Sequence, residues 1–194
     1  MAPTTLPALS PRLAQYVAAV RRWCAAGDTP VDADRLAALS AHAAALVAEP
    51  LELRPDQRVL PAAGYGRNLL YEDPDYGFVV LAMVWPGGIS GSPHDHGTWG
   101  VVAVAEGQVE VEDYAVVDAG ERWELASRGT IVGGIGATAT VLPPDHDVHR
   151  VGNAAPDRVA VSIHTYGRSL GPCRVIDPSG EVRWVEPVVH NVAG

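Results

Sequence analysis

The chain has 194 residues with an apolar fraction of 47%, 20 glycines and 16 prolines, a composition typical of one globular domain rich in turns. Its net charge of −9 argues against nucleic acid or an anionic membrane as a partner. No apolar run approaches the roughly 20 residues of a membrane span, and we expect no signal peptide. With only Cys24 and Cys173, the sequence fits a cytoplasmic protein without a disulfide scaffold.

The first part of the chain, residues 10–49, predicts two helices. Ser10 followed by Pro11 is typical of a helix start, because serine caps the free backbone N–H groups and proline fits the first helical position. Apolar residues then recur at helical spacing. A second segment with the same spacing runs from Asp32 to Glu49 and stops before Pro50. We expect both helices to pack on the outside of the structure formed by the rest of the chain.

From about residue 67 the hydrophobic period changes from that of a helix to that of a strand. About ten short segments rich in valine and aromatic residues follow, separated by turn signals. They are residues 67–71, 78–85, 99–104, 109–116, 122–125, 137–142, 148–151, 159–166, 173–176 and 182–185. Strands without intervening helices predict an antiparallel sandwich or barrel. We therefore expect a single domain, with a helical segment at 1–55 packed on a β-barrel at 56–194.

Two histidines, His94 and His96, stand two residues apart after the turn signal Gly87-Gly88. In an extended strand side chains repeat with period two, so both imidazoles would leave the same face of a sheet. Two neutral imidazoles on one face are half of a first-row transition-metal site. The alternative is that two histidines fell at this spacing by chance.

Two segments resemble the pair of motifs that define cupins. They are Gly88-x5-His94-x-His96 and Pro144-x-His146-x-x-His149-x-x-x-Asn153. The resemblance implies an all-β cupin jelly-roll barrel (a double-stranded β-helix), with the N-terminal α-helices outside and one metal held inside by both motifs. It also makes His149 the third ligand beside His94 and His96. His146 stands where the pattern usually has glycine, and we expect it at the rim.

The first motif departs from the usual cupin at one position. A glutamate normally follows the second histidine by four or five residues, whereas this chain has Gly100 and Val101 there. We therefore expect three neutral histidines without a carboxylate. Such a site keeps the full charge of a divalent ion and leaves coordination positions open. It suits iron(II) with an anionic substrate and O2, and it also suits zinc with bound water.

Ser162, His164 and Tyr166 lie on one predicted strand and project from one of its faces. A row of this kind can pass hydrogen bonds along and end with a phenol in a cavity. The alternative is a strand whose polar residues face solvent.

With the three histidines, this row completes a resemblance to the thiol dioxygenases, which include cysteine dioxygenase and the bacterial 3-mercaptopropionate dioxygenases. The matching segments are residues 65–69, 93–100, 148–151 and 162–166. The resemblance implies a non-haem iron(II) enzyme that converts a small organic thiol and O2 to a sulfinic acid. It further implies that the three histidines bind the iron and that the Ser-His-Tyr row is a hydrogen-bonded relay beside it.

Arg67 is similar to the arginine that holds the substrate carboxylate in cysteine dioxygenases, where the 3-mercaptopropionate branch usually has glutamine. A guanidinium suits a bidentate grip on a carboxylate. Residues 93–100, however, look more like those of the 3-mercaptopropionate enzymes. Both cysteine and 3-mercaptopropionate are therefore kept as candidate substrates, with cysteine slightly favoured. A salt bridge to Glu72 or Asp73 is the alternative role of Arg67.

The function has two alternatives: another metal-dependent cupin enzyme, or a cupin that binds a small molecule without turnover. Arg168 and Arg174 follow the relay strand and supply either a second cation near the pocket or surface charge. Because no cysteine follows the His-x-His pair, we expect no thioether crosslink of the animal cysteine dioxygenase kind. The sequence makes no prediction of the oligomeric state.

Overall fold

The computed structural model describes residues 9–26, 31–169 and 171–192, so part of the predicted 1–55 segment lies outside the described residues. Two helices and a short 3-10 turn come first: α1 (Pro11–Ala25), α2 (Ala33–Val47) and η1 (Pro55–Gln57). The strands of the described part are β1 (Gly66–Glu72), β2 (Val79–Trp85), β3 (Gly100–Glu106), β4 (Val109–Ala119), β5 (Trp123–Gly133), β6 (Thr138–Val141), β7 (His149–Asn153), β8 (Ala160–Tyr166), β9 (Cys173–Ile176) and β10 (Val182–Val185). The boundary at residue 55 stays a prediction.

Both helices begin with the expected kind of cap. The hydroxyl of Ser10 accepts the backbone N–H of Leu13, with Pro11 at the first helical position. The carboxylate of Asp32 accepts the backbone N–H of Arg35 at 2.8 Å. Neither described helix is long and apolar enough to span a membrane.

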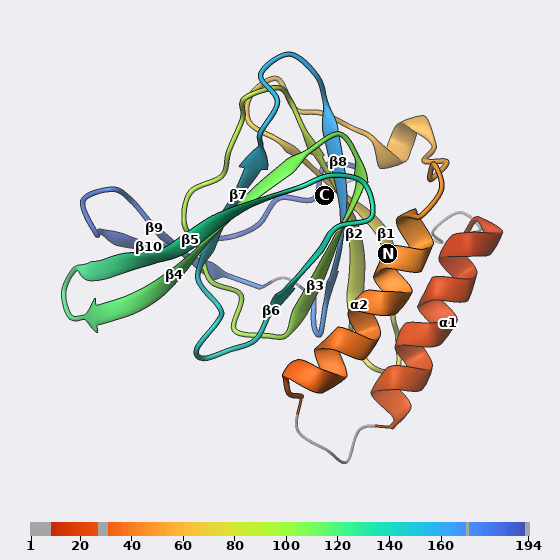
Figure 1. The fold of residues 1–194 in the computed structure, drawn as a ribbon, viewed down its shortest axis with the longest axis horizontal. Helices are drawn as coiled ribbons and strands as arrows, with labels where there is room; N and C mark the ends of the chain where they lie inside the picture. Colours follow the sequence, from red (N-terminus) through yellow and green to blue (C-terminus); the bar gives the residue numbers. More distant parts are fainter. Residues whose placement is uncertain (1–8, 27–30, 170, 193–194) are drawn as a thin grey trace.

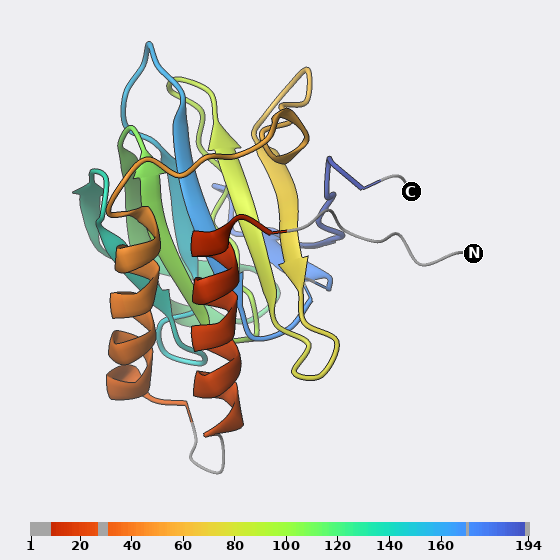
Figure 2. The ribbon, with the colours of Figure 1, turned by 90° about the vertical axis from the view of Figure 1, so that its right-hand side faces the viewer.

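All strand pairs are antiparallel and form two facing layers (Figure 1). One layer is a five-stranded sheet in the order β1-β2-β8-β3-β6. The other contains β5-β4-β7 and the β10-β9 pair. The helices α1 and α2 lie side by side on the outer face of the five-stranded sheet (Figure 2). The predicted fold class, an antiparallel β structure with the N-terminal helices packed outside, is thus confirmed.

The strand β2 shows why this sheet has two different faces. Alternate residues Val80, Ala82 and Val84 pack against the helices, while Leu81 and Met83 face the barrel interior. Because both faces are covered, the whole strand is buried and its sequence is a continuous apolar run. The neighbouring strand β8 alternates in the same way, which turns its polar row inward.

The hairpin of β4 and β5 is longer than the sequence predicted. The predicted strands were 109–116 and 122–125, whereas β5 continues to Gly133. Most of β5 is exposed, so its residues carry no alternation between buried and exposed positions. Backbone pairing with β4 extends it instead, through two register irregularities, and the hairpin reaches away from the barrel in Figure 1.

Candidate functional site

The three histidines predicted as ligands meet inside the barrel. One nitrogen from each of His94, His96 and His149 lies within 4.8 Å of the others, and their ring centroids are 4.7–5.0 Å apart. The Nε2 atoms of His96 and His149 are buried and have no hydrogen-bond partner. His94 lies 2.9 Å from the Ser92 carbonyl through Nδ1, which must therefore donate, leaving Nε2 with a free lone pair. This donor set fits a divalent transition metal.

The surroundings keep two of these imidazoles, those of His94 and His149, neutral. Burial, reinforced by the neighbouring His96, lowers the pKa of His94 to about 3. Burial also holds the pKa of His149 well below its ordinary value. A neutral imidazole offers a lone pair at neutral pH, so no proton has to leave these two residues before a metal binds.

The prediction that His94 and His96 lie on a regular strand is wrong. They belong to the connection between β2 and β3, where His94 makes single antiparallel bridges to His149 and Val175. The backbone N–H of His94 donates to the His149 carbonyl at 3.0 Å, and the reverse bond measures 3.1 Å. Gly97 then adopts a positive φ of 59° and turns the chain away. The reciprocal bridge brings the two cupin-like motifs together.

Asp147 holds the His-x-His loop from the second motif. Its carboxylate accepts the backbone N–H groups of His96 at 2.8 Å and of Gly97 at 3.0 Å. Burial acts to raise the pKa of Asp147, but the hydrogen bonds from His96 and Gly97 outweigh it and leave the pKa below its ordinary value. The ionised carboxylate therefore fixes the backbone that carries His96.

Two arginines hold the same loop from the other side. The guanidinium of Arg174 binds the carboxylate of Asp95 at 2.6 Å and lies 4.4 Å from the centroid of the Trp123 ring. Arg168 donates to the carbonyl of His96 at 3.1 Å. Neither arginine lines the pocket on which His94 and His96 open. Both are supports of the loop, a role that the sequence analysis missed.

The polar row of β8 faces the barrel interior, so the alternative of a solvent-facing row is wrong. Ser162, His164 and Tyr166 are at most 3% exposed. The Ser162 hydroxyl lies 2.8 Å from Nε2 of His164, and Nδ1 of His164 lies 2.9 Å from the Tyr166 hydroxyl. Trp85 donates its indole N–H to Ser162 at 2.9 Å. The row is therefore a continuous buried relay.

Tyr166 connects this relay to the histidines. Its ring stacks on His96 with centroids 4.8 Å apart. Burial raises the pKa of the Tyr166 phenol above its ordinary value and lowers that of His164 well below its own, so both groups are neutral near pH 7. A Cβ atom on Gly100 would lie 2.8 Å from the Tyr166 ring. The phenol ring thus occupies the space that a side chain at Gly100 would need, one of the two positions where the cupin pattern usually has glutamate.

Arg67 points into the same pocket and forms no ion pair among the described residues. Its guanidinium donates to the Tyr65 hydroxyl at 3.1 Å and to the Val188 carbonyl at 3.2 Å, and its Nε is buried without a partner. Asp73, one of the two acids considered as its partner, is bound by Arg21 instead. The alternative of a structural salt bridge is therefore wrong.

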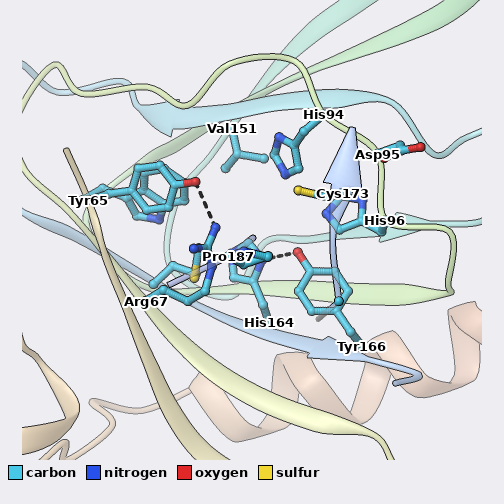
Figure 3. A pocket seen from close by; sticks show the side chains of 13 residues that line it. Tyr65, Arg67, His94, Asp95, His96, Val151, His164, Tyr166, Cys173 and Pro187 are labelled. Atoms are coloured by element: carbon cyan, nitrogen blue, oxygen red, sulfur yellow. Dashed lines mark hydrogen bonds between the residues drawn. The ribbon is translucent and has the colours of Figure 1, made fainter. Parts of the chain in front are cut away.

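Figure 3 shows these groups around one pocket, with the Arg67 guanidinium below the Tyr65 hydroxyl and His164 beside Tyr166. The lining residues include Tyr65, Arg67, Met83, Trp85, His94, Asp95, His96, Val151, His164, Tyr166, Cys173 and Pro187. No sequence motif marks Tyr65, Trp85 or the free thiol of Cys173 as lining residues. Their place in the pocket wall follows only from the way β2, β8 and β9 pack together. His146, by contrast, is exposed, as expected.

Comparison with known proteins gave one family match and several fold likenesses. Residues 6–179 match the family described as cysteine dioxygenase type I. An acetylacetone dioxygenase from Acinetobacter johnsonii is 19% identical over 71% of this chain and 85% of its own, with a TM-score of 0.45. A cupin-like protein from Thermotoga maritima is 19% identical over 64% and 78%, with a TM-score of 0.42. Likenesses of this size carry no information about the activity of this chain.

Proposed function

Because the chain belongs to the cysteine dioxygenase type I family, which confirms the predicted family and its cupin fold, we propose that it is a non-haem iron(II) thiol dioxygenase. The proposed substrate is a short thiol that carries a carboxylate, either cysteine or 3-mercaptopropionate. One observation carries the proposal: His94 and His96 of the three-histidine cluster line a pocket that also contains Arg67 and Tyr166. The predicted cytoplasmic location, where Cys24 and Cys173 would stay reduced, belongs to the same proposal.

The proposed ligands of the iron are His94, His96 and His149. Unpartnered ring nitrogens buried away from water cost folding free energy, and metal binding would remove that cost for His96 and His149. Bound iron(II) would supply open coordination positions for a thiolate and O2 together. The net reaction adds both oxygen atoms to sulfur and keeps the proton on the sulfinic acid. The sulfur gives up all the electrons that O2 gains, so no further reductant is needed.

The chain's own side chains would orient the substrate and hold a proton. Arg67 is free of carboxylate partners among the described residues, so its guanidinium can donate two parallel hydrogen bonds to the substrate carboxylate. Tyr166 keeps its proton because burial raises the pKa of the phenol. With its oxygen accepting from His164, the phenol can donate that proton into the pocket. The two groups would thus hold opposite ends of one small molecule.

The test is O2 consumption and sulfinate formation by the iron-loaded protein with cysteine, 3-mercaptopropionate and cysteamine, alongside zinc-loaded protein as a control. We expect turnover of a carboxylated thiol with iron alone. Arg67→Gln should raise KM for that thiol by about one to two orders of magnitude, the effect of one charge-assisted hydrogen bond, and leave cysteamine nearly unchanged. If no thiol is oxidised, or if zinc supports the same reaction, the proposed function is wrong and one of the other cupin functions applies.

A further inference from the structure

The segment after β10 returns to the pocket from outside the family match. The match ends at residue 179, whereas residues 187–191, here called the C-terminal strap, lie along the edge of the five-stranded sheet. Pro187 lines the pocket beside Arg67, as the close view shows (Figure 3). This part of the wall is therefore built by residues that the family pattern does not cover.

The strap is bound to β1 by hydrogen bonds that take the place of those from a further strand. β1 is an edge strand, and an edge leaves backbone N–H and C=O groups unpaired. Arg67 donates its backbone N–H to Nδ1 of His190 at 2.9 Å and accepts the backbone N–H of His190 at 2.8 Å. Leu69 makes the corresponding pair with the amide group of Asn191, at 2.8 and 3.0 Å. Two side chains and one backbone N–H thus satisfy four outward-facing backbone groups.

The strap also holds the side chain of Arg67. The Val188 carbonyl accepts from one guanidinium nitrogen at 3.2 Å, and the Tyr65 hydroxyl accepts from the other at 3.1 Å. Both acceptors are uncharged, so they orient the guanidinium without neutralising it. Its buried Nε keeps no partner. An oriented, unpaired cation in a pocket wall is suited to an anionic group on a ligand.

We propose that the C-terminal strap is a substrate-positioning element, which holds Arg67 so that the pocket prefers thiols with a carboxylate over thiols without one. This rests on the proposed function, because the carboxylate is that of the proposed substrate. The strap acts through Arg67 and takes no part in the reaction at sulfur. Its contribution should appear in binding of carboxylated thiols and nowhere else in the cycle.

The experiment releases the strap with the double variant His190→Ala and Asn191→Ala. The control is Val117→Ala, because that side chain is equally exposed, at 61%, and lies on β4, outside both the strap and the pocket lining. Hydrogen exchange at the backbone amides of Arg67 and Leu69 reports whether the strap has left β1. Anaerobic titration of the iron-loaded proteins with 3-mercaptopropionate and with cysteamine then gives two dissociation constants. If the double variant does not fold, the single variant Asn191→Ala replaces it.

We expect faster exchange at both amides in the strap variant, a dissociation constant for 3-mercaptopropionate raised about tenfold, and an unchanged one for cysteamine. Val117→Ala should match the wild type in every measurement. The proposal is overturned if exchange is unchanged, if exchange rises without loss of affinity, or if both thiols weaken equally. It also fails if the wild type binds both thiols alike. Because no O2 is present, an absence of sulfinate in the turnover assay refutes the proposed function separately.

Discussion

Replacing Trp85 with Phe should reverse the direction of the buried relay. An indole N–H can only donate, so the Ser162 oxygen accepts from Trp85 and its own hydrogen is directed to Nε2 of His164. Nδ1 of His164 then carries the hydrogen given to the Tyr166 oxygen, which leaves the phenol proton for the pocket. Without the indole donor, the serine can rotate, the imidazole can take the other tautomer and the phenol can point its proton back at His164.

The size of the effect depends on the groups that the substitution removes. One neutral hydrogen bond contributes about 0.5–1.5 kcal/mol, and the smaller ring adds a cavity term, so we expect about 1–3 kcal/mol less free energy of unfolding. A relay that is wrongly oriented most of the time should lower kcat about tenfold while iron content stays the same.

Tyr65→Phe is the control: it keeps the ring that stacks on Trp85 at 4.3 Å and removes only the contact with Arg67, so KM should change instead. An unaltered kcat in Trp85→Phe, with a tenfold loss in Ser162→Ala, would refute this reasoning.

Three further predictions concern the metal, the phenol and the fold. His149→Ala should lose most of its iron by metal analysis whereas His146→Ala keeps it, since His146 is exposed; the opposite pattern would exchange their roles. Tyr166→Phe should slow turnover without loss of iron, because it deletes only the hydroxyl at the end of the relay, and unchanged turnover would contradict that role. Burial acts to raise the pKa of Asp73, but hydrogen bonds from the backbone and from Arg21 outweigh it and lower the pKa. The carboxylate therefore stabilises the folded state above its unfolded pKa of about 3.9 and loses this effect as pH falls through the lower folded value. Asp73→Asn should reduce the free energy of unfolding by about 1–3 kcal/mol at pH 7, and the difference should shrink steadily in urea titrations below about pH 4; a difference independent of pH would contradict it.

The strands of the five-stranded sheet could be predicted because the helices cover one of its faces and the barrel interior covers the other. The strand β8 is an example: Val161 and Ile163 face the helices, while Ser162 and His164 face the interior. A period of two therefore survives in the sequence even though every residue of the strand is buried. Strand β5 has only one neighbouring strand and mostly exposed residues, so its last eight residues, 126–133, left no such pattern.

The sequence predicted which three histidines lie together and which side chains form the buried row, but not the residues that hold them in place. Spacing within a short motif identified His94 and His96, although the local conformation expected for them was wrong. The contacts of Asp147 with the loop backbone, and of Arg174 with Asp95, join residues 50 to 79 positions apart. No local pattern encodes such pairs, since they depend on which loops the barrel brings together.

The charges around the pocket explain how an acidic protein can present a cationic site. The chain as a whole carries a net charge of −9. Asp95 lies on the pocket lining, but its side chain is turned away from the other groups in Figure 3 and is bound by Arg174. Asp147 is occupied by backbone N–H groups. With these acids engaged and His94 neutral, the guanidinium of Arg67 in the pocket wall has no ion-pair partner among the described residues. Selection of the proposed anionic substrate would thus depend as much on the pairing of the nearby acids as on the arginine itself.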